Sequence, residues 1–150
     1  MKTKNQIQKE ALAALKGLRK GGIEVSMGVG KTLLGLKHMA VNYTDISKFL
    51  VVAPRKKIFQ SWTDDMNKFD YAHLDEHVTF STYLSLKKQV FDYDVIYLDE
   101  CHSLKFSHLQ WLLEYEAKGG IIIGLTGTYP VRKNTEKGKM CNRFCPKIYE

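Results

Sequence analysis

Apolar residues recur along the chain at two spacings, which predict helices alternating with strands. From Lys4 to Leu18 they recur every three or four residues, as in an amphipathic helix, and Gly21-Gly22 is expected to end it. The same spacing predicts helices over residues 31–41, 58–69, 107–117 and about 139–144, with a short helical stretch ending near 88.

Short apolar runs between these segments predict strands. Residues 49–53 (Phe-Leu-Val-Val-Ala) are apolar throughout, which is typical of a strand buried on both faces of a parallel sheet. Further strands are expected over residues 23–26, 77–80, 94–98 and 121–125. The alternation predicts an α/β fold, a mainly parallel sheet flanked by helices, formed by residues 1–150 as one domain.

Composition narrows the class of protein. The 150 residues are 44% hydrophobic and 26% charged, as in an ordinary globular protein. No apolar run approaches the ~20 residues that span a bilayer, and no signal peptide is evident, so no membrane partner is expected. The net charge of +7 favours a polyanionic partner such as nucleic acid, although excess lysine is often only a solvated face.

The three cysteines do not form a disulfide framework, which indicates a reducing, intracellular compartment. Cys141 and Cys145 could supply half of a metal site. Because no second Cys or His pair lies at partner spacing, reduced structural thiols are the preferred interpretation.

Residues 26–32 (Ser-Met-Gly-Val-Gly-Lys-Thr) form a glycine-rich loop between a predicted strand and a predicted helix. This pattern indicates a phosphate-binding loop: backbone N–H groups surround phosphate oxygens, Lys31 reaches the β/γ-phosphates and Thr32 holds Mg²⁺. The full signature has glycine where this chain has Val25. The residues expected to bind nucleotide here are Met27, Gly28, Val29, Gly30, Lys31 and Thr32.

Asp99 and Glu100 follow the predicted strand 94–98. Adjacent carboxylates after a buried strand require a compensating cation, and beside a phosphate loop this is expected to be Mg²⁺. Asp99 would hold the ion, and Glu100 would orient and deprotonate the attacking water. An acidic turn without chemistry is the alternative.

Three other places could contact ligands. Arg55, Lys56 and Lys57 follow the strand 49–53, where they could contact nucleic-acid phosphates or form a solvated basic turn. Thr82 could donate to a phosphate, cap a helix, or do both. Gln8 could pair with an adenine edge or be a surface residue.

The ordered motifs resemble the first RecA-like lobe of superfamily 2 helicases and translocases. The resemblance covers nearly the whole chain. The matching segments are Gln8, residues 26–32 (motif I), 51–55 with 60–62 (Ia), 81–83 (Ib), 99–102 (II) and 125–130 (III).

The resemblance implies roles for individual residues that composition alone cannot assign. Gln8 would read adenine, His102 would link the ATP site to motif III, and Thr126 and Thr128 would couple nucleotide state to movement. Arg55, Lys56 and Thr82 would contact the phosphate backbone of the nucleic-acid strand along which such a protein moves. The form of motif Ia is most similar to that of double-stranded-DNA translocases, which favours DNA over RNA.

Two departures from the family pattern matter. Tyr129 stands between the threonine and the proline of motif III. The chain ends where a first lobe ends, and Arg132 and Arg143 do not match the arginine-finger motif of a second lobe. An arginine finger is worth about 10³–10⁵ in rate, so the chain is expected to need a second RecA-like lobe, in cis or in trans, for efficient turnover.

The sequence therefore predicts the ATP·Mg²⁺-binding lobe of a nucleic-acid-dependent ATPase, an enzyme that moves on or remodels DNA. The alternative is a non-catalytic nucleotide- or DNA-binding subunit that regulates a larger complex. A phosphate-loop kinase or GTPase would leave the motif Ia and III matches unexplained.

Overall fold

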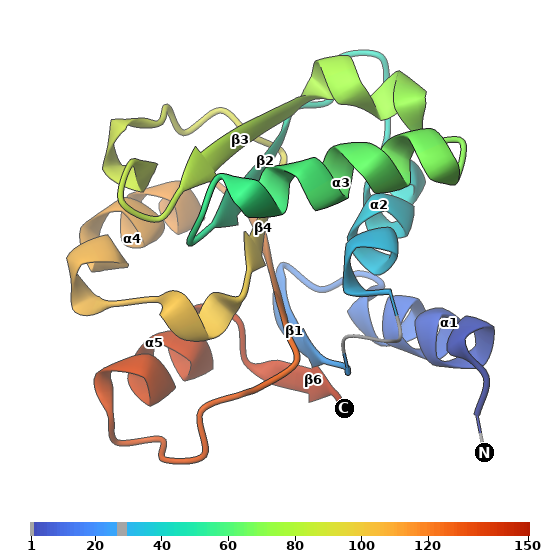
Figure 1. The fold of residues 1–150 in the computed structure, drawn as a ribbon. Helices are drawn as coiled ribbons and strands as arrows, with labels where there is room; N and C mark the ends of the chain where they lie inside the picture. The colour runs from blue at the N-terminus through green and yellow to red at the C-terminus, as the bar shows by residue number, and fades with distance from the viewer. Residues whose placement is uncertain (1, 27–29) are drawn as a thin grey trace.

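The computed structural model describes residues 2–26 and 30–150, so the predictions for Met27, Gly28 and Val29 lie outside the described residues. A six-stranded sheet with the order β3-β2-β4-β5-β1-β6 forms the centre of the molecule (Figure 1). Every strand pairing in it is parallel. The strands are β1 (Lys20–Glu24), β2 (Phe49–Ala53), β3 (Val78–Thr82), β4 (Val95–Asp99), β5 (Ile121–Thr126) and β6 (Lys147–Tyr149).

Helices cover both faces of this sheet (Figure 1). One face carries α1 (Lys4–Leu15), α2 (Lys31–Val41) and α3 (Lys57–Lys68), and the other carries α4 (Leu109–Ala117) and α5 (Glu136–Phe144). Short 3₁₀ helices are η2 (Ala72–His77), η3 (Leu86–Lys88), η4 (Cys101–Ser103) and η5 (Phe106–His108).

Alternate strand residues divide the interior into two hydrophobic cores. Val51 and Tyr97 point to the core under α1, α2 and α3, whereas Val52 and Leu98 point to the core under α4 and α5. A strand with helices on both faces must be apolar throughout, which explains the run in β2. The predicted three-layer α/β architecture is confirmed.

The amino-terminal boundary differs from the prediction. The first helix ends at Leu15, Gly17 has a φ of +78°, and Gly21 and Gly22 lie inside β1 instead of ending the helix. A Cβ added to Gly22 would lie 1.4 Å from the Tyr129 hydroxyl oxygen and 2.5 Å from the Cys145 carbonyl oxygen. Glycine is therefore required in this strand because two other segments approach its backbone.

The carboxy-terminal segment is more ordered than predicted. Helix α5 extends from Glu136, and the unpredicted strand β6 pairs with β1. Cys141, Cys145 and Phe144 pack in the second core. This segment is thus an integral part of the sheet and of one core.

Candidate active site

Three neighbouring strands bring the predicted motifs to one edge of the sheet. β4 ends at Asp99, β5 ends at Thr126, and β1 leads toward the phosphate loop. β5 lies between the other two and is parallel to both. The carboxyl ends of the strands therefore meet where open α/β sheets bind ligands.

Gly30 begins helix α2 from a left-handed conformation, with φ +84° and ψ +59°. No side chain caps this helix, so its first amide groups are available to an anion, which the helix dipole also favours. A Cβ added to Gly30 would lie 3.0 Å from the Gln8 side-chain nitrogen. Gln8 is buried near Gly30, and its side-chain oxygen accepts a hydrogen bond from Lys37.

Lys31 and Asp99 form the central ion pair of the site. The Lys31 ammonium lies 2.8 Å from Oδ1 of Asp99, whose side chain is 1% exposed. Among the described residues, this oxygen accepts no hydrogen bond. A buried carboxylate oxygen whose partner is only a cation fits a hard divalent ion such as Mg²⁺. Thr32, the other predicted magnesium ligand, is the next residue of α2 and is half-buried.

Trp62 and Tyr83 hold Asp99 from two other sides. The Trp62 indole donates to Oδ2 of Asp99 at 2.9 Å, and the Tyr83 hydroxyl donates to the Asp99 carbonyl oxygen at 2.8 Å. Burial raises the pKa of Tyr83 well above its usual value, so this hydroxyl remains a donor. Trp62 is fully buried in the core, and the sequence predicted neither contact with Asp99.

Glu100 follows Asp99 in a left-handed conformation with φ +52° and ψ +54°. A non-glycine residue in this region costs roughly 1–2 kcal/mol, and such strain concentrates at functional sites. One carboxylate oxygen of Glu100 lies 4.0 Å from the Arg55 guanidinium. The turn thus directs Glu100 to the same edge of the sheet as Arg55.

The residues predicted to couple the motifs lie together. Nδ1 of His102 is 2.8 Å from Oγ1 of Thr126, which accepts the backbone N–H of Thr128 at 3.1 Å. Tyr129 donates its backbone N–H to Glu24 at 2.6 Å and its hydroxyl to the Cys145 carbonyl oxygen at 2.7 Å. The additional residue in motif III therefore joins that motif to β1 and to the segment after α5.

Arg55, Lys56 and Thr82 lie beside one another at the ends of β2 and β3. Ala53 pairs with Thr82, and Arg55 and Lys56 are exposed. The Thr82 hydroxyl also accepts the Ser85 backbone N–H at 3.2 Å, so it caps the following turn as one alternative predicted. These residues lie at the amino-terminal end of α3, which the helix dipole makes favourable for phosphate.

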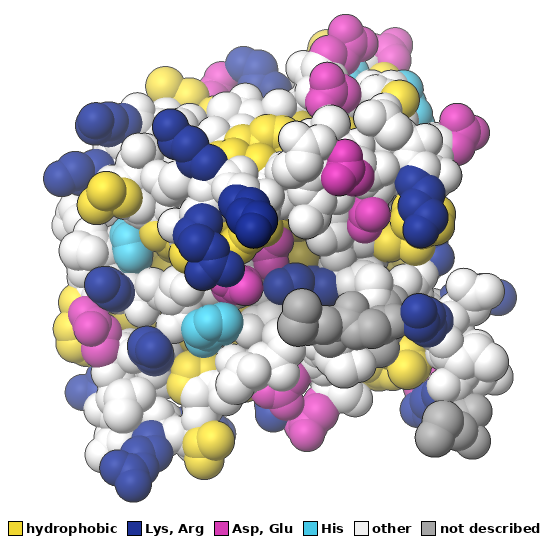
Figure 2. Space-filling model, in the orientation of Figure 1, with side chains coloured by type: hydrophobic (Ala, Val, Ile, Leu, Met, Phe, Trp, Pro, Cys, Tyr) yellow, Lys and Arg dark blue, Asp and Glu magenta, His cyan; other side chains and the backbone are white. Residues whose placement is uncertain are grey.

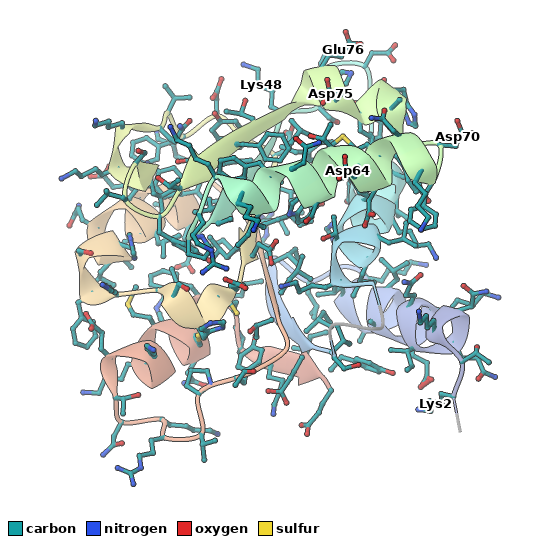
Figure 3. The ribbon with its side chains drawn as sticks, in the orientation of Figure 1. Lys2, Lys48, Asp64, Asp70, Asp75 and Glu76 are labelled. Atoms are coloured by element: carbon teal, nitrogen blue, oxygen red, sulfur yellow. The ribbon has the colours of Figure 1, made fainter. Side chains whose placement is uncertain are left out.

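Acidic side chains lie at the opposite end of α3. Figure 3 labels Asp64, Asp70, Asp75 and Glu76 on α3 and the segment after it. Figure 2 shows acidic side chains at the upper right, whereas Lys and Arg gather over the left and centre of the same face. A phosphate backbone is therefore attracted to one end of α3 and repelled from the other.

Cys141 and Cys145 lie close to Cys101, a partner that sequence spacing did not indicate. The three buried sulfurs lie within 4.8 Å of one another, and the Cys141 thiol donates to the Cys101 carbonyl oxygen at 3.3 Å. The neighbouring Cys141 thiol raises the pKa of Cys101. A closed zinc site needs four ligands, and the described part of the chain adds no fourth ligand to this group. The thiols pack α5 against the acidic loop.

Within the described residues, no helix is long and apolar enough to cross a membrane.

Solved helicase structures share this fold. The UvsW helicase from bacteriophage T4 superposes with a TM-score of 0.76 at 16% identity, covering 96% of this chain and 59% of that one. The Pyrococcus furiosus Hef helicase domain gives a TM-score of 0.73 at 18% identity, covering 95% of this chain and 37% of that one. The chain thus spans less than two thirds of either structure. The fold is that of a RecA-like lobe of the helicase class.

A third structure, the Sulfolobus solfataricus SWI2/SNF2 ATPase core in complex with double-stranded DNA, gives a TM-score of 0.62 at 17% identity, covering 93% of this chain and 35% of that one. No curated protein sequence matches this chain. Residues 2–131 match the family model described as "Type III restriction enzyme, res subunit". The chain belongs to this family and is an ATP-binding lobe of the superfamily 2 helicase type.

Proposed function

We propose that this chain binds ATP with Mg²⁺ and, with a second RecA-like lobe, couples ATP hydrolysis to movement on DNA or its remodelling. The observation that carries the proposal is the Lys31–Asp99 ion pair of 2.8 Å, with Glu100 directly after it. A cation from helix α2, a carboxylate at the end of β4 and a second carboxylate directly after it are the groups that nucleotide hydrolysis needs in one place.

Each residue of the site has a separate task. When ATP enters, Lys31 would exchange Asp99 for the β/γ-phosphates, and Asp99 and Thr32 would hold the magnesium ion. Bound Mg²⁺ supplies neutralisation of charge on the phosphate oxygens. Glu100 orients a water toward the γ-phosphorus and accepts its proton as the bond to the β-phosphate oxygen breaks, releasing ADP and phosphate. Gln8 reads the adenine base.

Nucleic acid is proposed to lie across the amino-terminal end of α3. Arg55, Lys56 and Thr82 supply a charged guanidinium, an ammonium and a hydroxyl at adjoining strand ends. These groups bind phosphates and carry no base specificity. DNA is favoured over RNA because similar structures are described in complex with double-stranded DNA and with a DNA substrate mimic.

The second lobe is proposed to close over the exposed edge of this site, in cis or in trans. His102, Thr126 and Thr128 connect the acidic loop to the end of β5 by hydrogen bonds, which gives nucleotide state a direct path to motif III. We propose that this connection transmits the presence of ATP to the nucleic-acid side.

The proposal is tested first by Mg·ATP binding to this chain, measured by calorimetry. Lys31→Ala is expected to weaken binding by at least about tenfold, the value of one charge-assisted hydrogen bond. Lys9→Ala, which removes an exposed lysine from α1, is the matched control. Absence of Mg·ATP binding to the parent chain, or equal affinity in Lys31→Ala, contradicts the proposal.

Turnover is tested in the complex with the second lobe. Glu100→Gln is expected to retain ATP binding and to lose DNA-stimulated hydrolysis by about 10²–10⁴-fold, the usual contribution of a general base. Glu114→Gln makes the same chemical change on the exposed face of α4 and serves as the control. ATP binding without DNA-stimulated turnover in the complete complex would instead identify a non-catalytic regulatory subunit.

A further inference from the structure

The two carboxylate oxygens of Asp99 have different partners. Oδ1 faces the Lys31 ammonium at 2.8 Å, and Oδ2 accepts the Trp62 indole N–H at 2.9 Å. Asp99 is 1% exposed and Trp62 is 0% exposed, so water does not compete for either contact. The indole therefore determines which oxygen is left to face the phosphate loop.

The main chain of Asp99 is fixed separately. Asp99 ends β4 beside Leu125 of β5, and its carbonyl oxygen accepts the Tyr83 hydroxyl at 2.8 Å. The motion that remains for the carboxylate is rotation about its own side-chain bonds. A hydrogen bond to Oδ2 opposes that rotation, because turning the group would break it.

The indole itself cannot move away from Asp99. A Cβ added to Gly35 would lie 2.5 Å from Cη2 of Trp62, so the ring fits against α2 only because residue 35 is glycine. On another side the ring lies 6.2 Å from that of Tyr97, measured between centroids. Helix α2 also carries Lys31, so the ammonium and the indole are both held relative to the same helix.

We propose that Trp62 is a positioning residue for the metal-binding carboxylate: its N–H holds Oδ2 of Asp99 so that Oδ1 is directed at Lys31 and at the magnesium ion that accompanies ATP. This inference rests on the proposed function. Groups that hydrogen-bond a metal-binding carboxylate fix its orientation, and losing one typically costs 10–100-fold in metal affinity.

Trp111 provides a matched comparison for a role in packing alone. It is the only other tryptophan in the sequence. It is 5% exposed, donates its indole N–H to the Gln89 carbonyl oxygen at 3.0 Å and stacks on Tyr115. It belongs to the second core, and among the described residues its hydrogen bond and ring contacts are with Gln89, Phe91 and Tyr115. Both tryptophans therefore have a buried ring and a satisfied N–H, and only Trp62 bonds to Asp99.

The experiment measures how much Mg²⁺ is needed for half-maximal ATP binding in the parent chain, in Trp62→Phe and in Trp111→Phe. Trp62→Phe is expected to raise that Mg²⁺ concentration by about 10–100-fold, while ATP affinity in excess chelator stays that of the parent. Trp111→Phe is expected to leave the Mg²⁺ requirement unchanged, even where it lowers the thermal midpoint.

A shape-preserving replacement separates the hydrogen bond from packing if Trp62→Phe folds poorly. In the Trp111→Phe background, β-(3-benzothienyl)alanine at position 62 keeps both fused rings and replaces the N–H by sulfur. The same increase in Mg²⁺ requirement is expected, with the thermal midpoint lowered only by the loss of the N–H donor to Oδ2 of Asp99. The Trp62 indole ¹H–¹⁵N signal is expected to differ between the parent and Asp99→Asn. In the parent, it is also expected to move on addition of Mg·ATP.

The outcomes distinguish this inference from the function on which it rests. If the parent binds Mg·ATP and the benzothienyl protein needs no more Mg²⁺ than the Trp111→Phe chain, Trp62 is only a packing residue and the inference is overturned alone. If the parent binds no Mg·ATP, the proposed function fails and the inference fails with it.

Discussion

His102 and Thr126 bridge the ends of β4 and β5 through one contact of 2.8 Å between Nδ1 and Oγ1. Thr126 is fully buried and its hydroxyl also accepts the N–H of Thr128, so one oxygen joins the acidic loop to motif III. A single hydroxyl can therefore be removed to test whether the two motifs act together.

Thr126→Val is expected to separate binding from coupling. The valine matches threonine in shape but leaves His102 without its hydrogen-bond partner and the Thr128 N–H without its acceptor, which costs about 1–3 kcal/mol in the free energy of unfolding. Denaturant titration measures that loss, and DNA-stimulated turnover of the two-lobe complex is expected to fall while Mg·ATP affinity is retained. Thr79→Val, at the exposed position of β3, is the control. Unimpaired stimulation would exclude a coupling role.

Glu100→Gly is expected to raise stability and abolish turnover. Relief of the left-handed conformation raises the free energy of unfolding by about 1–2 kcal/mol. The added flexibility of glycine in the unfolded chain lowers it by about 0.4–1 kcal/mol. The net gain of up to about 1.6 kcal/mol is measurable by denaturant titration. Asp70, with φ +66°, is the other described non-glycine residue in this conformation. Asp70→Gly should stabilise similarly without affecting activity, and a loss of stability in Glu100→Gly would show that no strain is stored there.

Gly124→Ala is expected to destabilise the chain by about 1–3 kcal/mol, the usual cost of overpacking a core. The new Cβ would lie 2.6 Å from the Cys145 Cβ and 2.8 Å from its sulfur, so the strand or α5 must shift. Gly127→Ala is the matched control, because the nearest atom to its new Cβ among the described residues, the Val25 carbonyl oxygen, would be 3.4 Å away. Thermal unfolding of the two variants checks the difference, and equal midpoints would contradict it.

His38 is expected to make stability depend on pH. Burial lowers the pKa of His38 from 6.5 to about 4, and its Nδ1 lies 2.7 Å from the Tyr97 hydroxyl. Between these pKa values the unfolded chain binds a proton that the folded chain does not, so stability falls as pH decreases from 6.5 to 4. The loss is at most about 3 kcal/mol.

His38→Gln keeps a polar group near Tyr97 but cannot titrate. Denaturant titrations at several pH values are expected to show a smaller decrease in its stability between pH 6.5 and 4. Parallel pH profiles for the two proteins would assign the acid sensitivity to other groups.

Arg55→Ala is expected to weaken nucleic-acid binding about equally for all sequences and to reduce the slope of log K against log salt by about one. Lys68→Ala removes a positive charge from the last residue of α3, at the end opposite to Arg55, and should leave that slope nearly unchanged. Fluorescence anisotropy with duplex DNA at several salt concentrations checks both variants. Equal slopes in parent and Arg55→Ala would remove Arg55 from the proposed interface.

The sequence predicted elements whose signal is local. The run 49–53 and the helix 31–41 have the predicted bounds, because continuous apolarity and helical spacing are properties of neighbouring residues. The order of the motifs also predicted that Lys31 and Asp99 meet. Parallel strands bring their carboxyl ends to one edge, so residues that follow different strands converge there.

Contacts set by distant segments were not predictable in this way. Gly21 and Gly22 have the local appearance of a helix end, but Tyr129 and Cys145 approach the backbone of Gly22 from more than 100 residues away. The Trp62–Asp99 hydrogen bond depends on how α3 packs over β4. A buried indole N–H usually finds an acceptor, and that was the available signal. Which residue supplies the acceptor could be known only from the fold.

The family match ends at residue 131, but the second core includes residues beyond that position. Helix α5 supplies Met140 and Phe144 to that core, and β6 supplies the strand beside β1. A protein cut at the end of the family match would expose an apolar sheet face and a free strand edge, both of which promote aggregation. The boundary of the sequence family therefore lies inside the cooperative folding unit, and expression of this lobe for study has to include α5 and β6.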